Sequence, residues 1–126
     1  MKQKIQQILI VEDEPALISA LRIKLEMAGY KVHLAPDGEA GLKASTNLHP
    51  DLILLDIIMP KMDGLTMLAK LREDKWGETA KIMLLTNLSD EKKAMAAVQH
   101  GVYDYLVKTD WKIDDVLEKV KSRLNQ

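Results

Sequence analysis

Residues 51–56 have the sequence Asp-Leu-Ile-Leu-Leu-Asp, in which four consecutive aliphatic residues stand between two acidic ones. An uninterrupted apolar run of this length predicts a β-strand that is buried on both faces, because a strand with one face in water alternates between apolar and polar residues. Three further runs of this kind occupy residues 8–11, 82–85 and 105–107. Residues 32–34 alternate in polarity and predict a fifth strand, at the edge of a sheet.

Segments with a helical repeat of apolar residues lie between these strands. The repeats comprise Leu17, Leu21, Leu25 and Ala28; Leu65, Leu68 and Leu71; and Ile113, Val116, Leu117, Val120 and Leu124. Pro15 and Gly29 bound the first helix, whereas residues 89–91 open the fourth and Gly101 closes it. Strand and helix therefore alternate five times. This pattern predicts an α/β fold with a doubly wound five-stranded parallel sheet, right-handed crossovers and the strand order 2-1-3-4-5.

The size and charge of the chain narrow the classes of function. Its 126 residues, of which 47% are hydrophobic, predict one domain over residues 1–126. The net charge is -1, with basic and acidic residues interspersed, so we expect no direct contact with nucleic acid or with a membrane. Cysteine is absent, which excludes disulfides and thiolate metal sites and fits a reducing cytoplasm. The apolar run at 8–11 is too short for a signal peptide or a membrane span, so we expect a cytoplasmic protein.

Polar side chains follow four of the predicted strands, where the carboxyl ends of parallel strands form the usual ligand site. These side chains are Glu12, Asp13, Glu14, Asp56, Thr86 and Lys108. Two carboxylates about 4 Å apart repel each other by roughly 4 kcal/mol at an effective dielectric constant of about 20, so such a cluster requires compensation. Mg²⁺ supplies it with one or two protein carboxylates and leaves positions for water and phosphate oxygens. We expect Asp13 and Asp56 to be its direct ligands.

Each of these residues also has an ordinary structural role when it is taken alone. Residues 12–14 precede a helix, where acidic side chains cap or favour the first turn. Asp56 and Thr86 fit turn or strand-end positions that bond the backbone, and Lys108 fits a solvated strand end. The functional interpretation depends on all of them meeting at one edge of one sheet, because independent structural roles need not converge.

The chain resembles a response-regulator receiver domain of two-component signalling, similar to the single-domain chemotaxis type, from about residue 7 to residue 124. The resemblance rests on Ile-Leu-Ile-Val-Glu-Asp-Glu at 8–14, Asp-Leu-Ile-Leu-Leu-Asp at 51–56, Met59-Pro60 with Asp63-Gly64, Leu-Leu-Thr at 84–86, and Gly101 followed by Asp-Tyr-Leu-Val-Lys at 104–108. It implies a flavodoxin-like (βα)5 fold and a phosphorelay function. A sensor histidine kinase or a phosphotransfer protein would be the phosphoryl donor, and the effector protein stays unknown.

The resemblance also implies a role for each site residue. Asp56 would be the nucleophile and phosphoacceptor, and it would bind Mg²⁺ together with Asp13. Glu12 would hold a metal-bound water, and the backbone carbonyl of Ile58 would be a third protein ligand of the ion. The domain would catalyse its own phosphorylation and dephosphorylation and would not be an enzyme acting on other substrates.

Three further residues would respond to the phosphoryl group. Lys108 would pair with Asp56 and then with the phosphoryl oxygens, Thr86 would donate its hydroxyl, and Tyr105 would be the aromatic switch coupled to Thr86. Two positions depart from the family pattern. Thr109 follows Lys108 where proline is usual, and Asn87 follows Thr86 where a small residue is usual. These departures bear on the loop after Lys108 and on the rate of hydrolysis.

Three other functions fit parts of the same pattern. A haloacid-dehalogenase type of phosphatase needs a second aspartate two residues after the first, and Pro15 stands at that distance from Asp13. A flavin-binding module needs small phosphate-binding donors in the first loop, where residues 12–14 are acidic. A receiver that is never phosphorylated and serves only as a protein-binding module stays a genuine alternative, because a fold does not establish a function. The chain could equally be a receiver excised from a longer regulator.

Overall fold

The computed structural model describes residues 4–86, 91–102, 104–108 and 112–125. Its elements, in chain order, are β1 (Gln7–Val11), α1 (Pro15–Met27), β2 (Lys31–Ala35), α2 (Gly38–Leu48), β3 (Leu52–Asp56), α3 (Gly64–Glu73), η1 (Gly77–Thr79), β4 (Ile82–Thr86), α4 (Glu91–Ala97), η3 (Val98–His100), β5 (Asp104–Val107) and α5 (Ile113–Leu124). None of the helices in this described part of the chain is long and apolar enough to cross a lipid bilayer.

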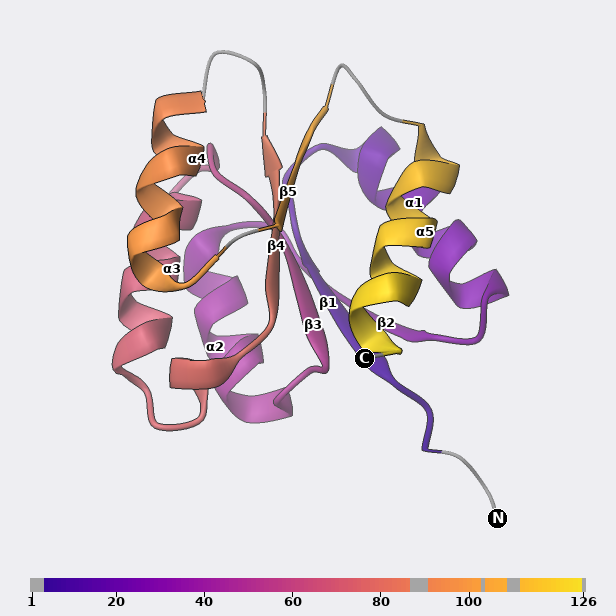
Figure 1. The fold of residues 1–126 in the computed structure, drawn as a ribbon, viewed down its shortest axis with the longest axis horizontal. Coiled ribbons are helices and arrows are strands. Elements are labelled where there is room, and N and C mark those ends of the chain that lie inside the picture. The colour runs from indigo at the N-terminus through magenta and orange to yellow at the C-terminus, as the bar shows by residue number, and fades with distance from the viewer. Residues whose placement is uncertain (1–3, 87–90, 103, 109–111, 126) are drawn as a thin grey trace.

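The five strands form one parallel sheet in the order β2-β1-β3-β4-β5. Figure 1 shows α1 and α5 on one face of this sheet and α2, α3 and α4 on the other. The predicted fold class and strand order are therefore confirmed. Because all five strands run the same way, their carboxyl ends lie along a single edge of the sheet, where the polar residues that follow the strands can meet.

The central strands explain why their sequences are continuously apolar. In β1, Leu9 and Val11 belong to the core beneath α2 and α3, whereas Ile8 and Ile10 belong to the core beneath α1 and α5. All four side chains are completely buried. Successive residues of a strand point to opposite faces, so a strand covered on both faces needs apolar residues at every position.

The two edges of the sheet differ in how well the sequence predicts them. Strand β2 lies at one edge and is only partly buried, as its alternating sequence indicates. Strand β5 lies at the other edge, and the prediction that residues 105–107 are buried on both faces is wrong. Tyr105 is exposed and its two successors are half-buried. An edge strand lacks a neighbour on one side, so an apolar run there need not be enclosed.

The helix ends agree with the predicted capping residues where they are described. Pro15 is the first residue of α1, and Gly29 lies just beyond its end with a φ of +99°. Gly101 follows η3 with a φ of +78°. Both glycines adopt the left-handed backbone that favours glycine after a helix. The fourth helix begins at Glu91 and tightens into a 3₁₀ turn at Val98; its predicted opening residues Ser89 and Asp90 lie outside the described residues.

Candidate functional site

Three carboxyl groups meet at the carboxyl ends of β1 and β3. Glu12 and Asp13 directly follow β1, and Asp56 is the last residue of β3. One carboxylate oxygen from each of the three lies within 4.8 Å of the others. Glu12 and Asp56 are buried, whereas Asp13 is exposed. The cluster is therefore open to solvent on the side of Asp13 and enclosed by protein on the side of Glu12.

Lys108 brings the positive charge to this cluster from the end of β5. Its ammonium Nζ donates to both carboxylate oxygens of Glu12, at 3.0 and 3.1 Å. The same Nζ lies 3.4 Å from Oδ1 of Asp56 and 3.9 Å from Oε2 of Glu14. Only 13% of the lysine side chain is exposed. The resemblance implied a pairing of Lys108 with Asp56, and in this structure Glu12 is the closer partner.

Burial and mutual repulsion change the protonation of these groups. Burial, together with the charge of Asp56, raises the pKa of the Glu12 carboxyl to about 7. Burial also raises the pKa of Asp56, although Lys108 opposes the shift. Burial alone would lower the pKa of Lys108, but its hydrogen bond to Glu12 and the charge of Asp56 outweigh that effect and raise it. The site thus holds more negative charge than its one lysine neutralises.

The donor set fits a hard divalent cation. Oδ1 of Asp56 is buried and accepts no hydrogen bond from the described residues. Its ion pair with Lys108 is 3.4 Å long, and an ion would supply the missing short contact to this buried oxygen. Both oxygens of Glu12 already accept hydrogen bonds from Lys108. Asp13 and Asp56 are therefore better placed than Glu12 to bind an ion directly, and Mg²⁺ needs only one or two such carboxylates.

The loop after β3 is fixed by the start of α3. The amide of Gly64 donates to the carbonyl oxygen of Ile57 at 2.7 Å, and Asp63 caps the helix by accepting from the amide of Thr66 at 2.8 Å. A Cβ on Gly64 would lie 2.2 Å from the carbonyl oxygen of Asp56. Sequence reasoning used Gly64 only as part of a motif and missed this role. An aspartate cap followed by glycine soon after a buried strand was the available signal.

The other predicted site residues are described to different extents. Ile58 lies in the loop after β3 and is 49% exposed. Its aliphatic side chain has no ligand atom, so its backbone carbonyl is the candidate ligand. The backbone of Thr86 ends β4 and pairs with Val107, but its side chain, like Asn87 and Thr109, lies outside the described residues. Tyr105 is 48% exposed on β5. The phosphate contact of Thr86 and the switch of Tyr105 stay predictions.

The family model for the response regulator receiver domain matches residues 8–121 of this chain. Among curated proteins, the DNA-binding dual master transcriptional regulator RpaA of Synechocystis is 37% identical over 120 residues, which are 95% of this chain and 49% of that protein. The alkaline phosphatase synthesis transcriptional regulatory protein PhoP of Bacillus subtilis is 37% identical over 103 residues, which are 82% of this chain and 42% of that protein. The chain thus spans about half the length of these relatives.

Solved structures of receiver domains also match this chain. A CheY-like response regulator receiver domain protein from Methanospirillum hungatei superposes with a TM-score of 0.87 at 29% identity, covering 97% of this chain and 95% of that one. The receiver domain of the sensor histidine kinase PA1611 from Pseudomonas aeruginosa has a TM-score of 0.86 at 27% identity, covering 98% and 100%. That domain was solved with a magnesium ion in its active site cleft. The chain therefore belongs to the response regulator receiver domain family of two-component signalling.

Proposed function

We propose that this chain is a phosphoacceptor in which Asp56 takes a phosphoryl group from a phosphohistidine of a sensor histidine kinase or phosphotransfer protein. The observation that carries the proposal is the environment of Oδ1 of Asp56. This atom is buried without a hydrogen bond and lies 3.4 Å from the ammonium of Lys108, in a carboxylate cluster that is open on the side of Asp13. A carboxylate oxygen of this kind is available both to an ion and to an incoming phosphorus.

The chemistry requires little more than position and charge. A carboxylate oxygen of Asp56 attacks phosphorus in line, the phosphorus–nitrogen bond breaks, and the histidine nitrogen keeps the electron pair. Lys108 neutralises the equatorial oxygens as they approach, and Asp13 with Asp56 holds Mg²⁺. When bound, Mg²⁺ supplies the remaining charge neutralisation and orients the phosphoryl oxygens. Glu12 keeps Lys108 in place through its two hydrogen bonds and would also hold a metal-bound water.

The product is an acyl phosphate, which water can hydrolyse to restore the Asp56 carboxylate. The domain would thus catalyse both its own phosphorylation and its own dephosphorylation. Phosphorylation puts three acceptor oxygens and a larger negative charge next to Lys108. If Lys108 turns from Glu12 toward these oxygens, β5 gains a contact that exists only in the phosphorylated state. A contact of this kind can shift an equilibrium between two conformations.

An exposed apolar patch on α4, η3 and β5 is our candidate output surface. We define this patch by three apolar residues of these elements, Met95, Val98 and Tyr105, which are individually 68%, 46% and 48% exposed. Tyr105 lies on β5, and Lys108 directly follows this strand. A movement of Lys108 can therefore shift Tyr105 through the backbone of β5. We propose that phosphorylation, with Thr86 as intermediary, changes how Tyr105 packs and so alters this patch for an effector protein. The charge balance of the chain favours a protein as that partner rather than nucleic acid.

Beryllofluoride with Mg²⁺ tests the site and the switch together, because it adds a phosphoryl mimic to Asp56. Chemical shifts should change around Asp13, Asp56 and Lys108 and also at Met95 and Tyr105. Asp56→Asn should abolish all the changes, and Thr86→Ala should abolish only those on the patch. Changes confined to the three site residues would reject the switch. A complete absence of changes would favour the second candidate, a receiver that binds partners without phosphorylation.

Our proposal retains the expectation of a cytoplasmic protein.

A further inference from the structure

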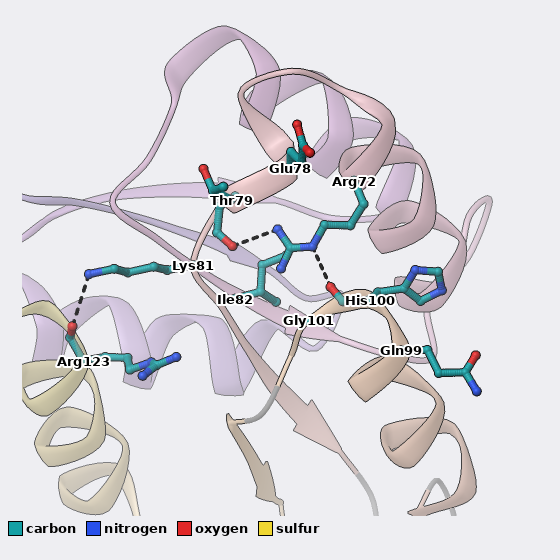
Figure 2. A pocket seen from close by; sticks show the side chains of 10 residues that line it. Arg72, Glu78, Thr79, Lys81, Ile82, Gln99, His100, Gly101 and Arg123 are labelled. Atoms are coloured by element: carbon teal, nitrogen blue, oxygen red, sulfur yellow. Dashed lines mark hydrogen bonds between the residues drawn. The ribbon is translucent and has the colours of Figure 1, made fainter.

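A cavity of about 410 Å³ lies at the amino ends of β4 and β5, at the other end of the sheet from the carboxylate cluster. Residues of α3, η1, η3 and α5 line it, together with the turn before β5. Figure 2 shows the side chain of Arg72 extending from α3 into the middle of this cavity. Nothing in the proposed phosphoryl transfer uses these residues. The volume falls in the range of about 300–1,000 Å³ that is typical of small-molecule sites.

The guanidinium of Arg72 is held in a fixed position by neutral partners. Its Nε donates to the carbonyl oxygen of His100 at 2.6 Å, and its Nη1 donates to the carbonyl oxygens of Gly77 and Ala80 at 2.7 and 2.9 Å. Burial lowers the pKa of the guanidinium. None of the described carboxylates forms an ion pair with it. Its positive charge is therefore preorganised and has no counterion among the described residues.

The other charged side chains of the cavity increase its excess of positive charge. Lys81 is exposed, and its Nζ is 3.5 Å from the carbonyl oxygen of Arg123. It also has no carboxylate partner in the part of the chain that the structure describes. Arg123 is neutralised by Asp104, with 2.5 Å between Nε and Oδ2. Glu78 is the one acidic residue in the described cavity lining, so Arg72 and Lys81 together outnumber it.

We propose that this cavity binds a small phosphate-bearing anion between Arg72 and Lys81. Nε and Nη1 of Arg72 are occupied by the three carbonyl oxygens, so Nη2 is the guanidinium nitrogen that would donate to the phosphate, and Lys81 would add a mobile point charge. The carbonyl oxygens of Gly77, Ala80 and His100 would repel an anion on their own, but they point to Arg72, whose charge offsets them. A bound anion would contact the turn at Gly101, which connects η3 to the strand that carries Tyr105. Binding would thus act on the output surface from the end opposite Asp56.

A titration of the full chain with pyrophosphate, in the absence of Mg²⁺ and at constant ionic strength, tests this site by NMR. We expect saturable shifts of the backbone amides of Ala80, His100 and Gly101. Lys81→Gln should weaken this binding by about fivefold, as expected for the loss of one charged contact at a surface. Lys43→Gln is the matched control, because Lys43 is exposed on α2 and lies outside the cavity lining. It should leave the affinity unchanged.

Arg72→Lys gives an independent test, because it keeps the charge and removes the planar fork. It should weaken pyrophosphate binding more than Lys81→Gln does, and a thermal melt will show whether the variant folds. If it does not fold, Lys81→Gln still decides the question. Shifts that appear only around Asp13 and Lys108, that do not saturate, or that are unchanged in Lys81→Gln would overturn the proposal. Equal affinity for malonate would assign the cavity to carboxylates and reject the phosphate ligand.

Discussion

Replacing Glu12 by glutamine removes the charge of a carboxyl group that is completely buried beside Asp56. The pKa of this carboxyl is raised from 4.5 to about 7, chiefly because burial disfavours the charged form. Between these two pH values the folded protein binds more protons than the unfolded chain. The contribution of Glu12 to the free energy of unfolding of the metal-free protein should therefore be most favourable below about pH 4.5 and should fall as the pH rises to 7.

The size of this effect follows from the shift. A difference of one pKa unit corresponds to about 1.4 kcal/mol, so the Glu12 carboxyl accounts for a loss of about 3 kcal/mol between pH 4.5 and pH 8. Asp56 adds a change of the same sign, because its pKa is raised as well. The raised pKa of Lys108 acts only at alkaline pH. Glu12→Gln is neutral at every pH, so at pH 8 it should be more stable than the wild type by up to about 3 kcal/mol.

Urea denaturation of the metal-free protein at several pH values between 4.5 and 8 measures this difference. The wild type should lose stability across the range, and Glu12→Gln should lose much less. Glu14→Gln is the matched control, because it removes the same charge from a side chain that is 60% exposed at 3.9 Å from Lys108. It should keep the wild-type dependence on pH. Parallel curves for the wild type and Glu12→Gln would refute the assignment of this proton to Glu12.

Three further predictions follow from the site. Asp13→Asn should weaken Mg²⁺ binding at least about tenfold in titration calorimetry, the loss typical of changing even an outer partner of a metal ligand; unchanged affinity would place the metal elsewhere. Gly64→Ala should lower the free energy of unfolding by about 1–3 kcal/mol in urea, because the new Cβ would lie 2.2 Å from the carbonyl oxygen of Asp56; wild-type stability would mean that the loop yields freely. Because receivers usually carry a small residue directly after the threonine that ends this strand, Asn87→Ala should change the lifetime of the phosphorylated protein, measured as the decay of the labelled species; an identical decay would mean that Asn87 does not affect hydrolysis.

The arrangement of strands and the carboxylate cluster followed from local patterns. Apolar runs such as residues 52–55 identify strands, and parallel strands necessarily bring their carboxyl ends to one edge. Glu12, Asp13 and Asp56 could therefore be placed together from the sequence alone. The residue types also indicated a metal site, because oxygen donors that repel one another require a cation.

Features that depend on contacts between distant segments could not be predicted in this way. The predicted strand order puts the fifth strand at an edge, whereas its apolar run predicts burial on both faces. The structure shows Tyr105 exposed, because periodicity alone does not reveal whether an edge strand is covered. Lys108 was expected beside Asp56, and its closer contact with Glu12 depends on side-chain geometry across 96 positions of sequence. Arg72 and His100 are 28 positions apart, and no periodic pattern connects them. The cavity at the amino ends of the strands therefore could not be predicted from the sequence.

The central claim is that Asp56 accepts a phosphoryl group with the help of Mg²⁺. Intact-mass spectrometry after incubation with a small phosphodonor tests it most directly. Wild-type protein should gain the mass of one phosphoryl group when Mg²⁺ is present and none when it is chelated. Asp56→Asn should gain none, whereas Asp114→Asn, which changes an exposed aspartate on α5, should be labelled like the wild type. Equal labelling of the wild type and Asp56→Asn would contradict the account.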